Sequence, residues 1–253
     1  MNLMEHLQPH MIVPLNIGGI DVSITNAVIA IWVASVLVFI TMTMAGRIGR
    51  LVPKGLQNLM ESLVSFSRQT LVVEILGEDG LAWFPFIATL FFFILFCNLL
   101  GLVPKMFTAT SNINVTASLA VVVFLCTQGA GMLKHGIGGY CKTFVPKGMP
   151  RGPLGLILIV FMVFVEFISQ LARPFSLAVR LFANMTAGHL VILVFISMIF
   201  MFQGVLARIF ITPVSVVMAV VMMAFEIFVS VLQAFIFAIL ASIYISLAVH
   251  PEH

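Results

Sequence analysis

Long runs without a charged residue divide the first half of the chain into segments that can each cross a lipid bilayer. Three such runs occupy residues 22–46, 80–104 and 106–133. A helix rises about 1.5 Å per residue and a hydrocarbon core is about 30 Å thick, so about 20 apolar residues make one crossing. The pattern predicts a first span at 22–46 and a helical hairpin over 80–133.

Two much longer apolar segments fill the second half, at 154–203 and from 205 onward. More than forty helical residues reach about 60 Å, twice the hydrocarbon thickness. We therefore expect a long helix pair over 154–249, each helix strongly tilted, kinked or broken, with Pro174 and Pro213 as candidate kink points. A turn near Gln203 would make this pair an antiparallel hairpin.

Between the first two spans, residues 54–76 show the apolar spacing of one helix face. This spacing predicts an amphipathic helix that lies along the membrane surface. A helix docked on the rest of the protein is the alternative, and both descriptions can hold together. The apolar positions are Leu56, Leu59, Met60, Leu63 and Val64, and the opposite face carries Gln57, Asn58, Glu61, Ser65 and Arg68.

Glycine, proline and basic residues mark 134–153 as an inner loop. Basic residues gather on the cytoplasmic side of membrane proteins, so they also indicate orientation. With the amino terminus outside, only Lys105 and Arg208 lie on the outer side. The inner side then holds Arg47, Arg50, Lys54, Arg68, Lys134, Lys142, Lys147 and Arg151. We therefore expect the amino terminus outside and the carboxyl terminus inside.

Composition agrees with this pattern, because 62% of the residues are hydrophobic and only 8% are charged. A soluble domain carries about a quarter charged residues, so the balance excludes a water-soluble globule, a disordered chain and a disulfide scaffold. The net charge of +3 comes from scattered residues without a basic stripe, and nucleic-acid binding is not expected. We expect a single all-α integral membrane domain over 1–253, with about five membrane helices plus the amphipathic surface helix.

Neither a metal site nor a cofactor site is predicted. The three cysteines, Cys97, Cys126 and Cys141, are odd in number and lack a C-x-x-C spacing, which argues against a redox or metal role. An intramembrane hydrolase would need a nucleophile–base pair or a motif such as H-E-x-x-H, and the sequence has neither.

Ionisable residues inside membrane segments are costly, so they are candidates for function. Glu166, Arg173 and Arg180 follow one another at intervals of seven residues and form one slowly drifting stripe. Asn184 lies one turn beyond Arg180, whereas His189 points to the opposite side of the helix. Along a continuous helix, Arg180 is about 21 Å from Glu166 and about 13 Å from His189.

The last segment carries Glu226 and Gln233 on one face, again seven residues apart. An antiparallel hairpin would bring Glu226 towards His189 and Gln233 towards Arg180. Purely structural interpretations stay open, since buried polar side chains also hold membrane helices together. They are an ion-pair lattice for Arg173, a structural His–Glu hydrogen bond, and a polar helix contact for Gln233.

Two sequence runs carry a family resemblance. SLAVRLFANMTAGH, at 176–189, resembles the signature of the a subunit of F-type ATP synthases. LQAFIFAILASIYISLA, at 232–248, resembles the carboxyl-terminal motif of the same family. The spans, the surface helix and the two long terminal helices also fit, so the resemblance covers nearly the whole chain.

The resemblance implies a stator subunit that conducts protons, is not catalytic on its own, and offers two offset half-channels to the carboxylates of a rotating c-subunit ring. Its implied partners are the c ring, the b-subunit peripheral stalk, the remainder of the complex and the lipid membrane. The essential arginine falls on Arg180. The inlet half-channel falls on Asn184, His189, Glu226, Gln233 and Asn114, and the outlet half-channel on Glu166, Ser169, Arg173 and Ser176.

Some family members have a carboxylate in place of His189 and a histidine in place of Glu226, so this pair looks exchanged here. A stand-alone ion-coupled secondary transporter is the alternative function, but it would show internal repeats with interrupted helices, and the halves show no such symmetry. The sequence leaves open whether the transported ion is sodium instead of the proton. A bacterial inner membrane is favoured over a mitochondrial one.

Overall fold

The computed structural model describes residues 10–14, 16–17, 20–21, 23–47, 55–103, 106–143, 153–201 and 204–250. Within these ranges, five helices are long and apolar enough to cross a membrane. They are α1 (Asn26–Arg47), α4 (Phe84–Gly101), α5 (Ile113–Thr143), α6 (Pro153–Met201) and α7 (Val205–Val249). The predicted all-α membrane fold with about five membrane helices is confirmed.

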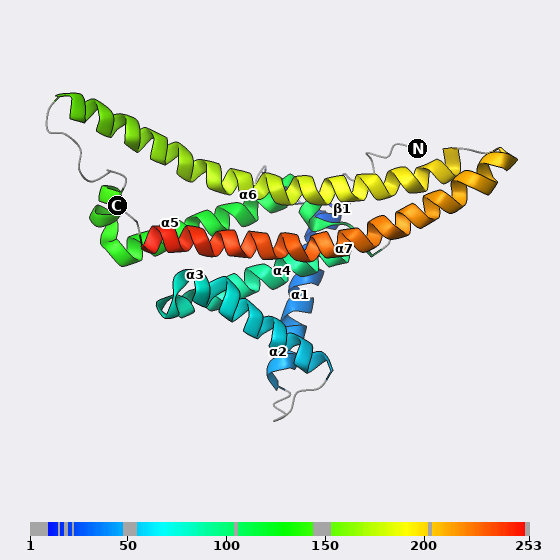
Figure 1. Ribbon diagram of the computed structural model, residues 1–253, viewed down its shortest axis with the longest axis horizontal. Helices are drawn as coiled ribbons and strands as arrows, with labels where there is room; N and C mark the ends of the chain where they lie inside the picture. Colours follow the sequence, from blue (N-terminus) through cyan, green and yellow to red (C-terminus); the bar gives the residue numbers. More distant parts are fainter. Residues whose placement is uncertain are drawn as a thin grey trace.

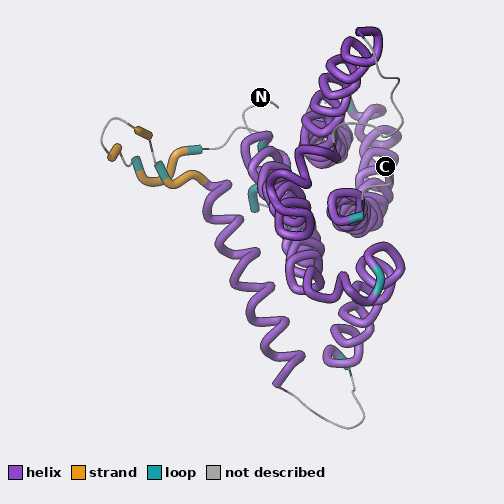
Figure 2. The backbone as a smooth tube through the Cα atoms, turned by 90° about the vertical axis from the view of Figure 1, so that its left-hand side faces the viewer, coloured by secondary structure: helices purple, strands orange, loops and turns teal. Residues whose placement is uncertain are grey.

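The first span crosses the direction of the longer helices (Figure 1). Figure 2, turned by 90°, shows those helices nearly end-on while α1 still runs down the picture. The 22 residues of α1 reach about 33 Å, close to the thickness of a hydrocarbon core. With α1 along the bilayer normal, α6 and α7 lie at a steep tilt, which accommodates their 49 and 45 residues.

The last two helices pack against each other as the predicted hairpin. Both remain helical through the prolines that mark candidate kinks, Pro174 in α6 and Pro213 in α7. Figure 1 shows the two helices curving along their length. Tilt and curvature therefore accommodate the excess length.

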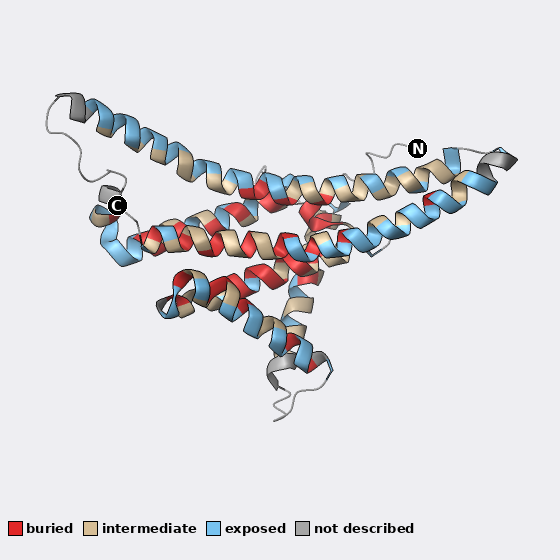
Figure 3. Ribbon diagram, in the orientation of Figure 1, coloured by how far each residue is buried: buried red, intermediate tan, exposed pale blue. Residues whose placement is uncertain are grey.

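The core lies between α4, α5 and the inner parts of the long helices (Figure 3). Phe91 and Phe92 of α4 pack with Leu181 of α6 and Phe237 of α7 in this cluster, and each is at most 2% exposed. Small residues on α7 let the neighbouring backbones approach closely. They are Ala234, Ala238 and Ala241, all with 0% exposure.

The amphipathic segment is a succession of helical elements that docks on the core. It comprises α2 (Leu56–Phe66), the π-helical η2 (Ser67–Val73) and α3 (Glu74–Leu76). Leu71 and Val72 are fully buried in the core cluster. The docked interpretation is therefore correct, and a location at the membrane surface stays a prediction.

The buried face of this segment differs from the expected one. Gln57, assigned to the polar face, is only 6% exposed, whereas Leu59, assigned to the apolar face, is 54% exposed. Gln57 tolerates burial because its amide donates a hydrogen bond to the Glu61 carboxylate (2.8 Å). The packing of α2 against α1 sets which of its residues are buried. The π-helical η2 begins only at Ser67 and rotates the residues that follow it, so a regular 3.6-residue pattern also cannot give the docked face from there onward.

The third span continues beyond the expected start of the inner loop. The structure is helical to Thr143, with a break at Gly136, where φ is 70° and ψ is 163°. Glycine adopts this left-handed φ at no steric cost, so the chain changes direction there and resumes a helix. Residues 144–152 lie outside the described part, as do Arg50, Lys54, Lys105, Lys147 and Arg151. The orientation they indicate stays a prediction.

Short elements complete the fold. Before α1, β1 (Met11–Val13) pairs antiparallel with β4 (Ile24–Thr25), and β2 (Asn16–Ile17) pairs with β3 (Ile20–Asp21). Two 3₁₀ turns, η3 (Glu78–Trp83) and η4 (Ala109–Ser111), precede α4 and α5. The sequence pattern does not predict these strands, because two or three residues are too short to show an alternation.

Candidate functional site

His189 of α6 and Glu226 of α7 are in direct contact across the helix interface. His189 Nδ1 lies against Glu226 Oε1, and the carboxylate residue is only 3% exposed. The other ring nitrogen, Nε2, is hydrogen-bonded to the Thr108 hydroxyl and lies 3.2 Å from the Gly101 carbonyl oxygen. One imidazole thus connects three helices and the segment before η4, with a titratable partner on one side and a hydroxyl on the other.

A glycine makes the contact possible. An added Cβ at Gly188 would lie 2.8 Å from Glu226 Oε1, closer than real Cβ atoms approach other atoms. By contrast, Gly129 of α5 has nothing within 4 Å of an added Cβ. Gly188 therefore leaves room for the Glu226 carboxylate beside His189.

A cavity of about 410 Å³ opens on this pair. Both His189 and Glu226 line it, together with Thr108, His10 and Asn26. The last two are joined by reciprocal bonds, from His10 N to Asn26 Oδ1 and from Asn26 N to the His10 carbonyl oxygen, both 3.2 Å. The amino-terminal segment is thus fastened to the start of α1 at the rim of a space that can hold several water molecules.

A second polar contact lies further along the same interface. The Asn184 amide donates to Gln233 Oε1 at 3.2 Å, and Gln233 is 3% exposed. Asn184 is one helical turn from Arg180. The antiparallel hairpin thus brings Glu226 to His189, as predicted, and Gln233 to Asn184, one helical turn from Arg180.

Arg180 lies on the exposed face of α6. Phe175 and Val179 beside it are 71% and 37% exposed, and Ala183 and Ala187 are exposed one and two turns further on. Among the described residues, no carboxylate forms an ion pair with this guanidinium. A permanent positive charge thus lies on an apolar surface, where a molecule that binds this surface can contact it.

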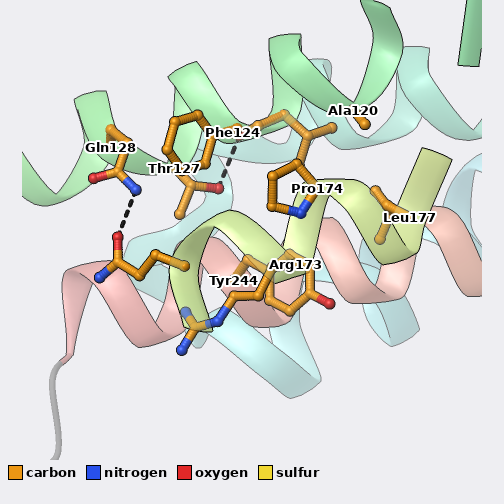
Figure 4. Close-up of a pocket in the computed structure, with 10 residues that line it drawn as sticks. Ala120, Phe124, Thr127, Gln128, Arg173, Pro174, Leu177 and Tyr244 are labelled. Atoms are coloured by element: carbon orange, nitrogen blue, oxygen red, sulfur yellow. Dashed lines mark hydrogen bonds between the residues drawn. The ribbon is translucent and has the colours of Figure 1, made fainter. Parts of the chain in front are cut away.

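The opposite end of α6 carries a third polar group. Arg173 forms an ion pair with Glu166 (3.7 Å), and its guanidinium lies 5.6 Å from the centre of the Tyr244 ring. The pair is half-buried, so its net contribution to stability is at most about 1 kcal/mol. Figure 4 shows Arg173 beside Tyr244, with Pro174 and Gln128 close by.

A chain of amides links this group to α5. Gln170 Nε2 donates to Glu166 Oε1 (3.5 Å), Gln128 Nε2 donates to Gln170 Oε1 (2.7 Å), and the Tyr140 hydroxyl donates to Gln128 Oε1 (2.7 Å). The cavity beside these residues measures only about 10 Å³. That volume is about that of a single water site, in contrast to the open space at the His–Glu pair.

The remaining predicted site residues lie apart from these contacts. Asn114 is exposed on α5, and its backbone N–H donates to Asn112 Oδ1 (2.9 Å). Ser169 is half-buried and Ser176 is exposed. The structure therefore brings together His189 with Glu226, Asn184 with Gln233, and Glu166 with Arg173. Among the described contacts, Asn114, Ser169 and Ser176 join none of these pairs.

Sequence reasoning missed Thr108, Gln128, Gln170 and Tyr244. All are uncharged, and a search for charged groups in apolar segments does not select them. A usable signal was present for Gln128 and Gln170, since each is an amide within a long apolar run. Within the described ranges, no group of three or more His, Cys, Asp and Glu residues could hold a metal ion.

Comparison with known proteins assigns the chain to a family. The family model described as ATP synthase A chain matches residues 28–246. A protein from Magnetococcus marinus named ATP synthase subunit a is 42% identical over 256 residues, covering 99% of this chain and 93% of its own length. Relatives of the same name from Hyphomonas neptunium (43% over 239 residues, 94% and 92% covered) and Chloroherpeton thalassium (42% over 245 residues, 94% and 71% covered) agree. The chain therefore belongs to the ATP synthase subunit a family.

Proposed function

We propose that this chain is the proton-conducting stator subunit in the membrane sector of a rotary F-type ATP synthase. The observation that carries the proposal is the position of Arg180. It lies on an exposed apolar face of α6, with the contacts of His189 and Asn184 to one side and the Glu166–Arg173 pair to the other. A charge in such a place is costly in lipid, so it favours a partner that brings a compensating carboxylate.

The inlet half-channel begins at the 410 Å³ cavity. A proton from that space reaches the His189–Glu226 pair and continues towards Asn184 and Gln233. Imidazole and carboxylate in contact can pass a proton between them, because each can hold the proton and the hydrogen bond joins them directly. The path ends beside Arg180, where a carboxylate of a c-subunit ring receives the proton.

The outlet half-channel lies at the other end of the same helix. Glu166 and Arg173, with Ser169 and Ser176 as weaker candidates, supply the polar groups there. Glu166 is about 21 Å along the axis from Arg180, and His189 is about 13 Å away in the opposite direction. The two paths are therefore offset, and a proton crosses between them only by riding on the ring.

The fixed cation determines the direction of exchange. A guanidinium stays protonated across the accessible pH range, so a carboxylate passing it is favoured in the ionised form. The ring group must lose its proton on one side of Arg180 and regain one on the other side. The same charge repels protons and blocks a direct leak, while each transferred charge is worth about 2.3 kcal/mol per 100 mV of membrane potential.

Family membership supports the rest of the assembly. The c ring covers the exposed face of α6 around Arg180, and the b subunits of the peripheral stalk hold this chain against rotation. The chain is a multi-pass protein of the bacterial inner membrane, with the amino terminus outside and the carboxyl terminus inside.

Crosslinking tests the proposed partner. Ala183→Cys places a thiol on the exposed face one turn from Arg180, and we expect it to crosslink to a cysteine beside the c-subunit carboxylate in the intact complex. Leu181→Cys is the control, because Leu181 is 0% exposed and faces the core of this chain. Equal, background-level crosslinking of both variants, with the chain present in the complex, would contradict the proposal.

A further inference from the structure

Four buried side-chain atoms in the described part of the chain have no hydrogen-bond partner there: Thr186 Oγ1, Glu226 Oε2, Ser230 Oγ and Gln233 Nε2. All four belong to α6 and α7. Buried polar atoms in folded proteins nearly always have a partner, either protein or ordered water. Their concentration in one interface therefore points to a place that binds a small polar ligand.

The register of the two helices places these four residues along one short stretch of the α6–α7 pair. His189 contacts Glu226, and Asn184 contacts Gln233, so α6 and α7 are fixed against each other at both points. Thr186 comes three residues before His189, and Ser230 comes four residues after Glu226. In an antiparallel pair these offsets place Thr186 and Ser230 at the same level, between the two contacts.

Ser230 differs from Thr127 and Ser242, two other buried hydroxyl residues in the described helices. Serine and threonine in a helix commonly donate to the carbonyl one turn earlier. Thr127 does so to Val123 (2.9 Å) and Ser242 to Ala238 (3.2 Å). Ser230 is 0% exposed and makes no such bond among the described contacts, so its hydroxyl is available to another partner.

The backbone at this point is held in place. The Ser230 carbonyl accepts a hydrogen bond from the Asn98 amide of α4 (3.3 Å), and Asn98 Oδ1 accepts one from the Thr110 hydroxyl (2.8 Å). Asn98 and Thr110 are both fully buried. The position of the Ser230 side chain is therefore set by three elements.

We propose that Thr186 and Ser230 bind water in the α6–α7 interface and complete the path that carries a proton from Glu226 to the Asn184–Gln233 contact. The inference rests on the proposed function. Glu226 and Gln233 are about 10 Å apart along the helix axis. One hydrogen bond spans about 3 Å, so intermediate groups are needed.

A hydroxyl suits this position because it donates one hydrogen bond and accepts two. Protonated Glu226 gives its proton from Oε2 to a bound water, and that water passes one of its own protons to the next acceptor. Each hydroxyl or amide on the way that takes up a hydrogen bond passes the proton on, and the carboxylate of the c-subunit ring beyond the Asn184–Gln233 contact receives it. Only Glu226 and that ring carboxylate therefore change charge. Glu226 is then reprotonated from His189.

Paired variants of the whole complex in inside-out membrane vesicles test the inference. The test variant combines Thr186→Val with Ser230→Ala, which removes two hydroxyls and little volume. The control combines Thr127→Val with Ser242→Ala, which removes two buried hydroxyls that bond only their own helix carbonyls. Proton pumping driven by ATP is measured per amount of this chain in the membrane.

We expect the test variant to pump at least about tenfold more slowly than the control, in line with the loss of a proton-transfer group. Thr186→Ser, which keeps the hydroxyl, should pump at the rate of the control. Pumping by the test variant at the control rate would overturn the inference. Glu226→Gln, measured in parallel, separates the two proposals. If Glu226→Gln pumps normally, the proposed inlet role of Glu226 is wrong. If Glu226→Gln loses pumping while the test variant keeps it, only the proposed role of Thr186 and Ser230 is wrong.

Discussion

His189 Nδ1 lies against Glu226 Oε1, and this contact joins the two long helices at the inner end of an open cavity. The carboxylate is almost completely buried, while the imidazole is half-buried and lines the cavity with it. A buried carboxylate beside an accessible imidazole can receive protons only through its partner or the cavity. In the proposed function, protons pass from the cavity to this pair and onward to Gln233.

Replacing His189 tests whether the imidazole exchanges protons. We expect His189→Gln to slow ATP-driven pumping by about 10². The pH dependence of pumping should also change, because glutamine cannot take up a proton as imidazole does. The measurement is vesicle acidification at a series of pH values. His135→Gln is the control, because that histidine is exposed and its Nε2 is hydrogen-bonded to the Val249 carbonyl oxygen (2.9 Å). An unchanged pH profile for His189→Gln would favour a purely structural hydrogen bond between His189 and Glu226.

Thr108 should matter through its hydroxyl. That group is hydrogen-bonded to His189 Nε2 and can donate to the neutral ring or accept from the charged one. We expect Thr108→Val to reduce pumping by about tenfold and Thr108→Ser to retain it. Thr116→Val is the matched control, since Thr116 is 0% exposed and donates to the Ile113 carbonyl oxygen (3.1 Å). Equal pumping by the Thr108→Val and Thr116→Val variants would rule out this role.

Gly188→Ala should displace the Glu226 carboxylate from His189. An added Cβ would lie 2.8 Å from Glu226 Oε1, and this oxygen is the end of a flexible side chain that can move away. We therefore expect pumping to fall by at least about fivefold, in line with the disturbance of a proton-transfer group, while the amount of chain in the membrane stays close to normal. Gly129→Ala, which meets nothing within 4 Å, should change neither quantity. The amount of chain is measured by immunoblot and the pumping by acidification, and identical results for the two variants would contradict the close approach.

Much of the fold could be predicted from apolar run lengths alone. The 49 and 45 residues of α6 and α7 exceed one bilayer crossing, and this excess required the observed tilt and curvature. The contact of His189 with Glu226, and the position of Gln233 on the part of α7 that faces α6 one turn from Arg180, followed from an antiparallel hairpin. Local periodicity was sufficient in these cases. The contact of Gln233 with Asn184 itself was not predicted.

Other features depend on tertiary contacts that periodicity does not contain. The buried face of α2 includes Gln57, because α2 packs against α1 and is followed directly by the π-helical η2, and neither feature is contained in a 3.6-residue pattern. Thr108 belongs to a segment far from His189 in sequence, and only the packing of α4 and α5 brings it there. The apolar composition of α6 likewise does not distinguish a face towards lipid from a face towards a partner.

The most direct test of the account is the separation of the two half-channels by Arg180. We expect Arg180→Ala to abolish ATP-driven pumping, and to raise the passive proton leak through the assembled complex, because no fixed charge then stands between the two paths. Arg173→Ala is the control, because the ion pair that Arg173 forms with Glu166 is half-buried and contributes little. This variant should keep at least about a tenth of normal pumping. Normal pumping by Arg180→Ala in the assembled complex would contradict the central claim.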